Sequence, residues 1–243
     1  MVITSLYTYI AILIRKKLPN GRWFFPAFLI GLIIPDLDTI IIYLNFSNIN
    51  LNNHTFGHSI ISALIIYLIL LIIYEINKKK EYLNLANGII SGMLFHIFCD
   101  VIISINLINI FWPLPFKSIS IYDNIIIQYY LKPYINIIIF LFFRYFFFYS
   151  IECIVNSSRK KGYLVKLLTR SMKAEIYIII LYTTFTVLNI KNISNLIFYT
   201  GYCFSMFIVY YTIITGWNSF NNFRHDTNKQ DSFKKERELI NIN

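Results

Sequence analysis

Histidine and aspartate gather in one strongly apolar part of this chain. Three of the four histidines and three of the six aspartates lie between residues 36 and 100; they are Asp36, Asp38, His54, His58, His96 and Asp100. Ionisable groups in or beside lipid are costly unless they are partnered, so they indicate function. Imidazole and carboxylate together are usual ligands of a transition metal, which would neutralise the aspartates and give the histidines a partner. The residue types therefore predict a metal site.

The composition indicates an integral membrane protein. Hydrophobic residues make up 57% of the 243 residues, charged residues only 14%, and the mean hydropathy is +0.58, whereas soluble domains average about 25% charged residues. The net charge of +10 does not indicate nucleic-acid binding, because the cations cluster between apolar runs without a zinc finger, a phosphate loop or a basic helix. The abundance of Ile, Asn, Lys, Tyr and Phe is typical of an AT-rich genome, organellar or endosymbiont genomes included.

Six stretches are long and apolar enough to span a membrane, since a spanning helix needs roughly 20 apolar residues. They cover residues 24–43, 59–76, 85–105, 134–155, 175–190 and 196–216. The stretch 3–14 is shorter and has no cleavage site after it, so an interfacial or re-entrant helix is expected there. The predicted fold class is all-α: a polytopic membrane bundle of about five to six transmembrane helices plus a short N-terminal interfacial helix.

Four segments are expected along the chain. They are an N-terminal interfacial segment (1–22), a membrane core that carries the candidate ligands (23–116), C-terminal transmembrane helices (117–217) and a polar tail (218–243). The three cysteines, at positions 99, 153 and 203, stand singly in apolar stretches. This spacing predicts packing residues rather than a zinc knuckle or a disulfide framework.

The distribution of Lys and Arg predicts how the bundle is oriented. The cations gather at 15–22, at 78–80, at 159–173 and after 217, and alternation of the spans puts all four clusters on one side. The positive-inside rule makes that side cytoplasmic, or stromal in a plastid. The same alternation gathers all six candidate ligands at the opposite face. The predicted location is a bacterial inner membrane or an organellar (plastid) membrane, with the site on the non-cytoplasmic face.

Each motif that carries candidate ligands also has a second interpretation. The proline of segment 35–38 ends or kinks a helix beside two aspartates, which could instead cap the following turn. His54 and His58 have H-x-x-x-H spacing without the Glu of a zinc protease, and could instead face lipid headgroups. His96 and Asp100 share one helical face and could also be a simple hydrogen-bonded pair.

Taken in order, the segments 31–38, 54–59, 92–100 and 111–114 resemble the signature of the membrane-bound metal-dependent hydrolases. This family is also described as LexA-binding, inner-membrane-associated, YdjM-like hydrolases. The resemblance covers roughly residues 24–116, and the histidine motif is one residue shorter here than is usual in the family. It implies that the family's metal-binding positions are taken by Asp36, Asp38, His54, His58, His96 and Asp100. A fainter likeness to zinc-dependent phospholipase C suggests phosphoester substrates by analogy.

The sequence thus predicts a membrane-embedded metal-dependent hydrolase that acts on a phosphoester or other ester of a lipid or lipid-linked substrate. One or two divalent ions, with zinc expected, would lower the pKa of a bound water and polarise the substrate. Asp38 is the expected catalytic base if Asp36 is a ligand, and Arg144 could bind a substrate phosphate. Two other classes stay open: a membrane transporter or metal-ion carrier, and a non-catalytic membrane scaffold. Membrane lipid is the expected partner, nucleic acid is not expected, and no protein partner is indicated.

Overall fold

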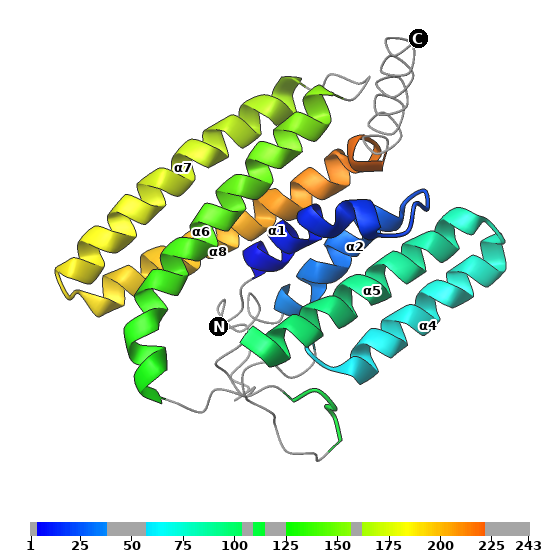
Figure 1. The fold of residues 1–243 in the computed structure, drawn as a ribbon, viewed down its shortest axis with the longest axis horizontal. Helices are drawn as coiled ribbons and strands as arrows, with labels where there is room; N and C mark the ends of the chain where they lie inside the picture. The colour runs from blue at the N-terminus through cyan, green and yellow to red at the C-terminus, as the bar shows by residue number, and fades with distance from the viewer. Residues whose placement is uncertain (1–3, 38–56, 104–108, 115–124, 157–161, 222–243) are drawn as a thin grey trace, which may run out of the picture.

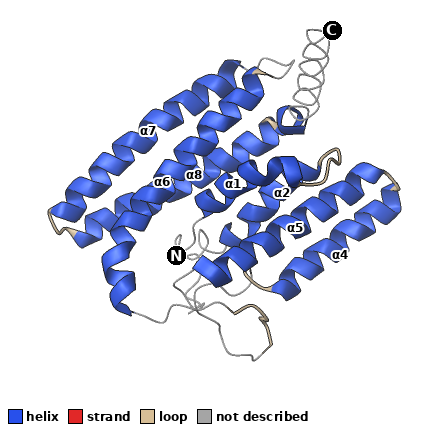
Figure 2. Cartoon of the chain, viewed as in Figure 1, coloured by secondary structure: helices blue, strands red, loops and turns tan. Residues whose placement is uncertain are grey.

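The computed structural model describes residues 4–37, 57–103, 109–114, 125–156 and 162–221, and these residues form helices and short connections without a strand (Figures 1 and 2). The helices are α1 (Thr4–Ile14), α2 (Phe24–Ile33), α4 (Ile60–Asn77), α5 (Lys80–Ile103), α6 (Ile125–Val155), α7 (Gly162–Val187) and α8 (Lys191–Thr215). Two 3-10 turns, Arg15–Lys17 and Ile34–Asp36, follow α1 and α2 directly. The predicted all-α membrane fold is confirmed.

Four of the described helices are long and apolar enough to cross a membrane, namely α4, α5, α6 and α8. They correspond to four of the six predicted spans. The predicted span 24–43 contains α2, which ends where Pro35 interrupts the helical run; its residues after 37 lie outside the described part of the chain. The predicted span 175–190 overlaps α7, which begins earlier, at Gly162, and ends at Val187; its first turns carry Lys and Arg and are helical as well.

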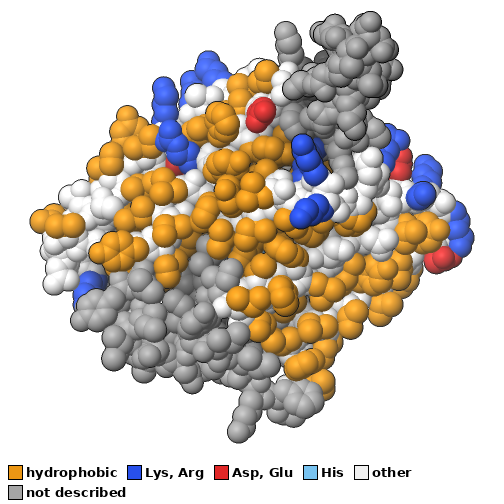
Figure 3. All heavy atoms as spheres, in the orientation of Figure 1, with side chains coloured by type: hydrophobic (Ala, Val, Ile, Leu, Met, Phe, Trp, Pro, Cys, Tyr) orange, Lys and Arg blue, Asp and Glu red, His pale blue; other side chains and the backbone are white. Residues whose placement is uncertain are grey.

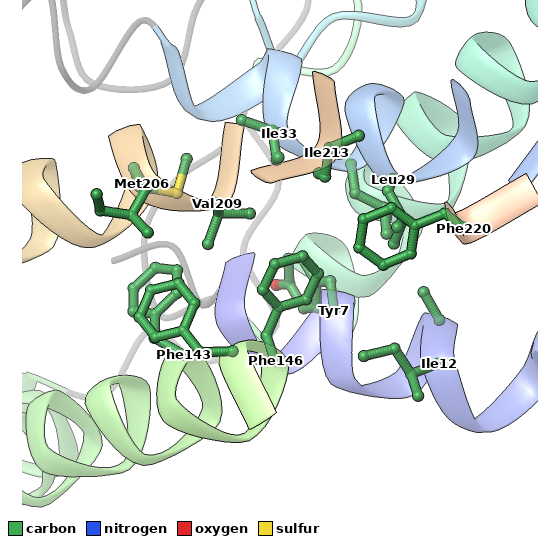
Figure 4. Packing of buried hydrophobic residues seen from close by; sticks show 14 of the residues in the cluster. Tyr7, Ile12, Leu29, Ile33, Phe143, Phe146, Met206, Val209, Ile213 and Phe220 are labelled. Atoms are coloured by element: carbon green, nitrogen blue, oxygen red, sulfur yellow. The ribbon is translucent and has the colours of Figure 1, made fainter. Parts of the chain in front are cut away.

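A core rich in aromatic residues joins α1, α2, α6 and α8. Tyr7, Phe143 and Phe146 are fully buried and face Val209 of α8 (Figure 4). The short helix expected over 3–14 is α1, and its residues Tyr7 and Ala11 have no exposed surface. The first helix is therefore part of the bundle core, despite having only 11 residues.

The outer surface suits a lipid environment. Helix α4 packs on α5, and its residues Leu68 and Ile72 are 58% and 60% exposed. Figure 3 shows apolar side chains across the middle of one face, with most Lys and Arg along its upper and right edges. At this basic end Arg22 pairs with Glu81 of α5, and Arg15 donates from Nη2 to the carbonyl oxygen of Phe220 at 2.7 Å. The basic clusters 15–22 and 78–80 thus lie at one end of the bundle, as predicted.

Candidate metal centre

Four of the predicted ligands lie together inside the bundle, at the end away from the basic cluster 78–80. Asp36 ends the 3-10 turn after α2, His58 lies just before α4, and His96 and Asp100 lie one turn apart near the end of α5. Asp36, His58 and His96 have no exposed surface, and Asp100 is 1% exposed. Three chain segments that are distant in sequence therefore bring two imidazoles and two carboxylates to one buried point.

Glycine allows the segment before α4 to approach the end of α2. A Cβ atom on Gly57 would lie 2.4 Å from the carbonyl oxygen of Pro35, much closer than side chains tolerate. Only glycine permits this close passage of backbone past backbone. The neighbours of these two residues are His58 and Asp36, so the close approach places an imidazole beside a carboxylate.

A second set of glycines holds α2 against α5. A Cβ atom would lie 2.3 Å from the Ile89 carbonyl oxygen if placed on Gly31, and 2.3 Å from the Phe28 carbonyl oxygen if placed on Gly92. Small residues at such positions let two helices approach until their backbones touch, as is common in membrane bundles. This contact fixes the height of Asp36, in the 3-10 turn that directly follows α2, relative to His96 on α5.

The ring nitrogens and carboxylate oxygens point toward one another. The Nε2 atoms of His58 and His96 lie 3.0 and 3.3 Å from Oδ2 of Asp100, and each lies 3.7 Å from Oδ1 of Asp36. The two imidazole rings meet edge to face, with centroids 5.2 Å apart. Each imidazole therefore faces both carboxylates through its Nε2 atom.

The hydrogen bonding of His96 determines which ring nitrogen carries a proton. Its Nδ1 lies 2.7 Å from the carbonyl oxygen of Leu32, and a carbonyl only accepts, so Nδ1 is the donor. In the neutral ring the Nε2 atom then directs a lone pair at the carboxylates of Asp36 and Asp100. That arrangement is repulsive unless a proton or a metal cation lies between nitrogen and oxygen. An imidazole that donates its other N–H to a backbone carbonyl is the usual state of a metal-ligating histidine.

Each carboxylate has one oxygen held by a tyrosine and the other directed at the histidines. Tyr7 donates to Oδ1 of Asp100, and Tyr202 donates to Oδ2 of Asp36 at 3.2 Å. Hydrogen bonds of this kind, from outside the ligand set, orient carboxylate ligands in metal sites. Sequence reasoning missed both tyrosines, because the chain has 19 of them and nothing in their spacing distinguishes these two.

The residues present fit a small divalent cation. In a tetrahedral zinc site with ligands at about 2.0–2.1 Å, neighbouring ligand atoms are about 3.3–3.4 Å apart, and the four nitrogen–oxygen separations between the histidines and the aspartates run from 3.0 to 3.7 Å. One ligand atom from each of Asp36, His58 and His96 lies within 4.8 Å of the other two, so this buried group could hold a metal ion. Asp100 Oδ2, at 3.0 and 3.3 Å from the two Nε2 atoms, is available as a fourth ligand atom.

Comparison with known proteins identifies the family. The family model described as YdjM inner membrane protein matches residues 2–215. The chain belongs to this family. No curated protein and no solved structure matches the chain. As a YdjM-family protein whose described residues include four apolar helices long enough to cross a bilayer, the chain is an integral membrane protein.

The YdjM-family match extends on both sides of the region 24–116 that carries the sequence motifs. It therefore includes α1 and all of α8, the helices that supply Tyr7 and Tyr202. Two predicted ligands, Asp38 and His54, lie outside the described residues. Arg144, expected to be able to bind a substrate phosphate, instead donates to the carbonyl oxygen of Met172 on α7 at 3.3 Å.

An aromatic turn lies beside the metal centre of this YdjM-family chain. The turn, residues 109–114, is attached to the start of α4: the amide of Ile60 donates to Ile110 at 2.9 Å, and Ser59 Oγ donates to the Trp112 carbonyl at 2.6 Å. Ser59 also caps α4 by accepting from the amide of Ile61. Phe111 and Leu114 are 42% and 49% exposed. An exposed apolar turn is thus attached to the residue that follows His58.

Proposed function

We propose that the protein is a membrane-embedded, metal-dependent hydrolase of an ester or phosphoester in a lipid or lipid-linked substrate. The observation that carries the proposal is the buried convergence of His58 and His96 on Asp36 and Asp100. A divalent cation held by such ligands, with zinc expected, lowers the pKa of a coordinated water and polarises a phosphoryl or carbonyl oxygen. These two effects are what hydrolysis of an ester requires.

The protein side chains have separable roles in this proposal. The imidazoles and the inward oxygen of Asp36 hold the cation, while the Leu32 carbonyl keeps the His96 ring turned toward it. A carboxylate that is not bound to the cation is the base that accepts a proton from water. Asp38, two residues after Asp36, is the predicted base, and Asp100 supplies an oxygen within hydrogen-bond reach of both imidazoles.

A lipid substrate is supported by the surroundings of the site. Helix α4 exposes apolar side chains along its length, and the aromatic turn 109–114, which is bonded to the start of the helix, exposes further ones. Aromatic residues with this exposure are typical of the level where lipid headgroups meet acyl chains. Ester and phosphoester bonds of lipids lie at the same level, so a lipid could present its scissile bond beside His58.

The proposed location is an inner membrane, with the metal centre at the non-cytoplasmic face, or a plastid membrane with the corresponding orientation. The support comes from charge: the basic clusters 15–22 and 78–80 lie at one end, and the positive-inside rule assigns that end to the cytoplasm or stroma. His58 lies just before the start of α4, and Asp100 lies near the end of α5. Both positions are at the end of the bundle away from these basic clusters.

The test uses full-length protein reconstituted with zinc in diacyl phospholipid vesicles, with products separated by mass spectrometry. Release of fatty acid marks attack on the acyl ester, and release of the headgroup or its phosphate marks attack on the phosphoester. His96→Ala is expected to lower either rate by more than about 100-fold, the upper range for loss of an outer-shell partner alone. His225→Ala, in the predicted polar tail, is the matched histidine control and should retain the rate.

The other functional classes are outcomes of the same experiment. A chain that holds stoichiometric zinc but releases no lipid product would overturn the hydrolase proposal in favour of a structural metal, since four protein ligands can close a site to water. Zinc movement across the vesicle membrane without hydrolysis would favour a carrier. Hydrolysis that survives His96→Ala unchanged would refute the assignment of the site.

A further inference from the structure

Two tyrosines from helices outside the ligand-bearing segments reach the metal centre. Tyr7 comes from α1 and Tyr202 from α8, and both side chains are buried, with 0% and 4% exposure. Each hydroxyl donates to one carboxylate: Tyr7 to Oδ1 of Asp100, and Tyr202 to Oδ2 of Asp36. In both carboxylates the oxygen that accepts from tyrosine is not the oxygen that faces the histidines.

Helix α1 supports both of these contacts. Thr4, one turn before Tyr7 on the same helix, lies 2.9 Å from the Tyr202 hydroxyl. Because that hydroxyl gives its own proton to Asp36, the Thr4 hydroxyl is the donor in the second bond. The Tyr7 ring also packs edge to face on the His96 imidazole, with centroids 4.8 Å apart. The first helix therefore orients one carboxylate directly and the other through Tyr202.

We propose that Tyr7 and Tyr202 are positioning residues that reserve one oxygen of each carboxylate, so that Asp36 and Asp100 bind a cation through a single oxygen each. With two imidazole nitrogens this gives a four-coordinate site of two nitrogens and two oxygens. Such a site suits zinc or cobalt(II), which accept nitrogen and low coordination numbers. It disfavours Ca²⁺, which takes six to eight oxygen ligands and reaches that number partly through carboxylates that bind with both oxygens.

This inference rests on the proposed metal site, and the experiment separates the failure of one from the failure of the other. Zinc and cobalt(II) are titrated into metal-free full-length protein in detergent, with and without an excess of Ca²⁺. The Tyr7→Phe and Tyr202→Phe variants keep the ring and lose only the hydroxyl. Tyr67→Phe is the matched control, because its hydroxyl donates to Asn87 at 3.0 Å between α4 and α5, away from the site.

Each of the two site variants is expected to bind zinc about 10- to 100-fold more weakly than the unchanged protein, the range measured for lost outer-shell partners. The visible absorption bands of bound cobalt(II) are intense for four ligands and weak for six. In the two site variants these bands should lose intensity, because the carboxylate oxygen released from the tyrosine hydroxyl can also bind the ion. Tyr67→Phe should alter neither the affinity nor the bands. A purely structural tyrosine would change thermal stability and leave the bands of the bound ion unchanged.

If the unchanged protein binds neither metal, the proposed metal site itself fails. If it binds metal and both tyrosine variants match it in affinity and spectrum, the positioning role is refuted. Should Tyr202→Phe not fold, Thr4→Val provides a second variant, since it removes only the donor that orients the Tyr202 hydroxyl. It is expected to weaken zinc binding less than Tyr202→Phe, and unaltered binding in Thr4→Val and Tyr7→Phe would also overturn the proposal.

Discussion

A single methyl group on Gly92 should weaken the metal site from a distance. The Cβ atom of Gly92→Ala would lie 2.3 Å from the Phe28 carbonyl oxygen, about 1 Å short of the 3.4 Å at which ordinary contact begins. The new Cβ atom and the Phe28 carbonyl oxygen are both held by the backbone of their helices, so α2 and α5 must move apart by about 1 Å. Overpacking of this kind costs about 1–3 kcal/mol of folding free energy.

The separation acts on the site because Asp36 follows α2 directly, whereas His96 and Asp100 lie on α5. An added 1 Å would stretch the 2.7 Å bond from His96 to the Leu32 carbonyl beyond the limit of about 3.2 Å for such bonds. Metal sites tolerate ligand displacements of only about 0.2 Å, and loss of an outer partner alone costs about 10- to 100-fold in affinity. Gly92→Ala should therefore bind zinc at least about tenfold more weakly.

The assay is a competitive zinc titration of Gly92→Ala in detergent, together with thermal unfolding of the metal-free protein. Gly162→Ala is the matched control, since a Cβ atom there has nothing within 4 Å, and it should retain affinity and melting temperature. A Gly92→Ala protein that melts several degrees lower but binds zinc with unchanged affinity would refute the coupling between helix contact and ligand geometry.

Three further predictions concern stability. Ser59→Ala removes the cap of α4 and the bond to Trp112, so it should cost about 1 kcal/mol and lower the melting temperature by about 2–4 °C; Ser59→Thr should lose less. In Arg15→Lys, the lysine cannot reproduce both the bond to Phe220 and the position over the Phe25 ring, so the change should cost about 2 kcal/mol of folding free energy. The control Arg22→Lys, at an exposed ion pair, should cost under about 1 kcal/mol. A zinc chelator should lower the melting temperature of the zinc-loaded protein, since metal at 100 times its Kd stabilises by about 2.7 kcal/mol, and unchanged melting would contradict this.

Much of the fold follows from hydropathy and helix-breaking residues. Long apolar runs predicted α4, α5, α6 and α8, because a bilayer sets the length of a spanning helix. Pro35 predicted the end of α2 beside Asp36, and alternation of spans predicted that ligands from separate segments would meet at one end. Helix ends and spacings of this kind are local, so they can be read along the sequence.

The contacts from α1 and α8 could not be predicted in the same way. Tyr7 and Tyr202 lie on helices far apart in sequence, and which of 19 tyrosines faces a carboxylate depends on three-dimensional packing. One signal was present in the sequence: Thr4 and Tyr7 are polar residues one turn apart in a short apolar stretch. In the structure both side chains are fully buried. Polar side chains on one face of an apolar helix indicate that this face meets other polar groups.

X-ray absorption spectroscopy at the zinc edge of the purified full-length protein tests the central claim most directly. The account predicts one stoichiometric ion with nitrogen and oxygen ligands at about 2.0–2.2 Å and no sulfur ligand. The more distant atoms of two imidazole rings should also contribute to the spectrum, and His58→Ala or His96→Ala should remove part of that contribution. Cys99, a buried free cysteine that precedes Asp100 in the sequence, is the alternative ligand that a sulfur signal would indicate. A sulfur shell at about 2.3 Å, a bound ion without imidazole scattering, or no bound ion would contradict it.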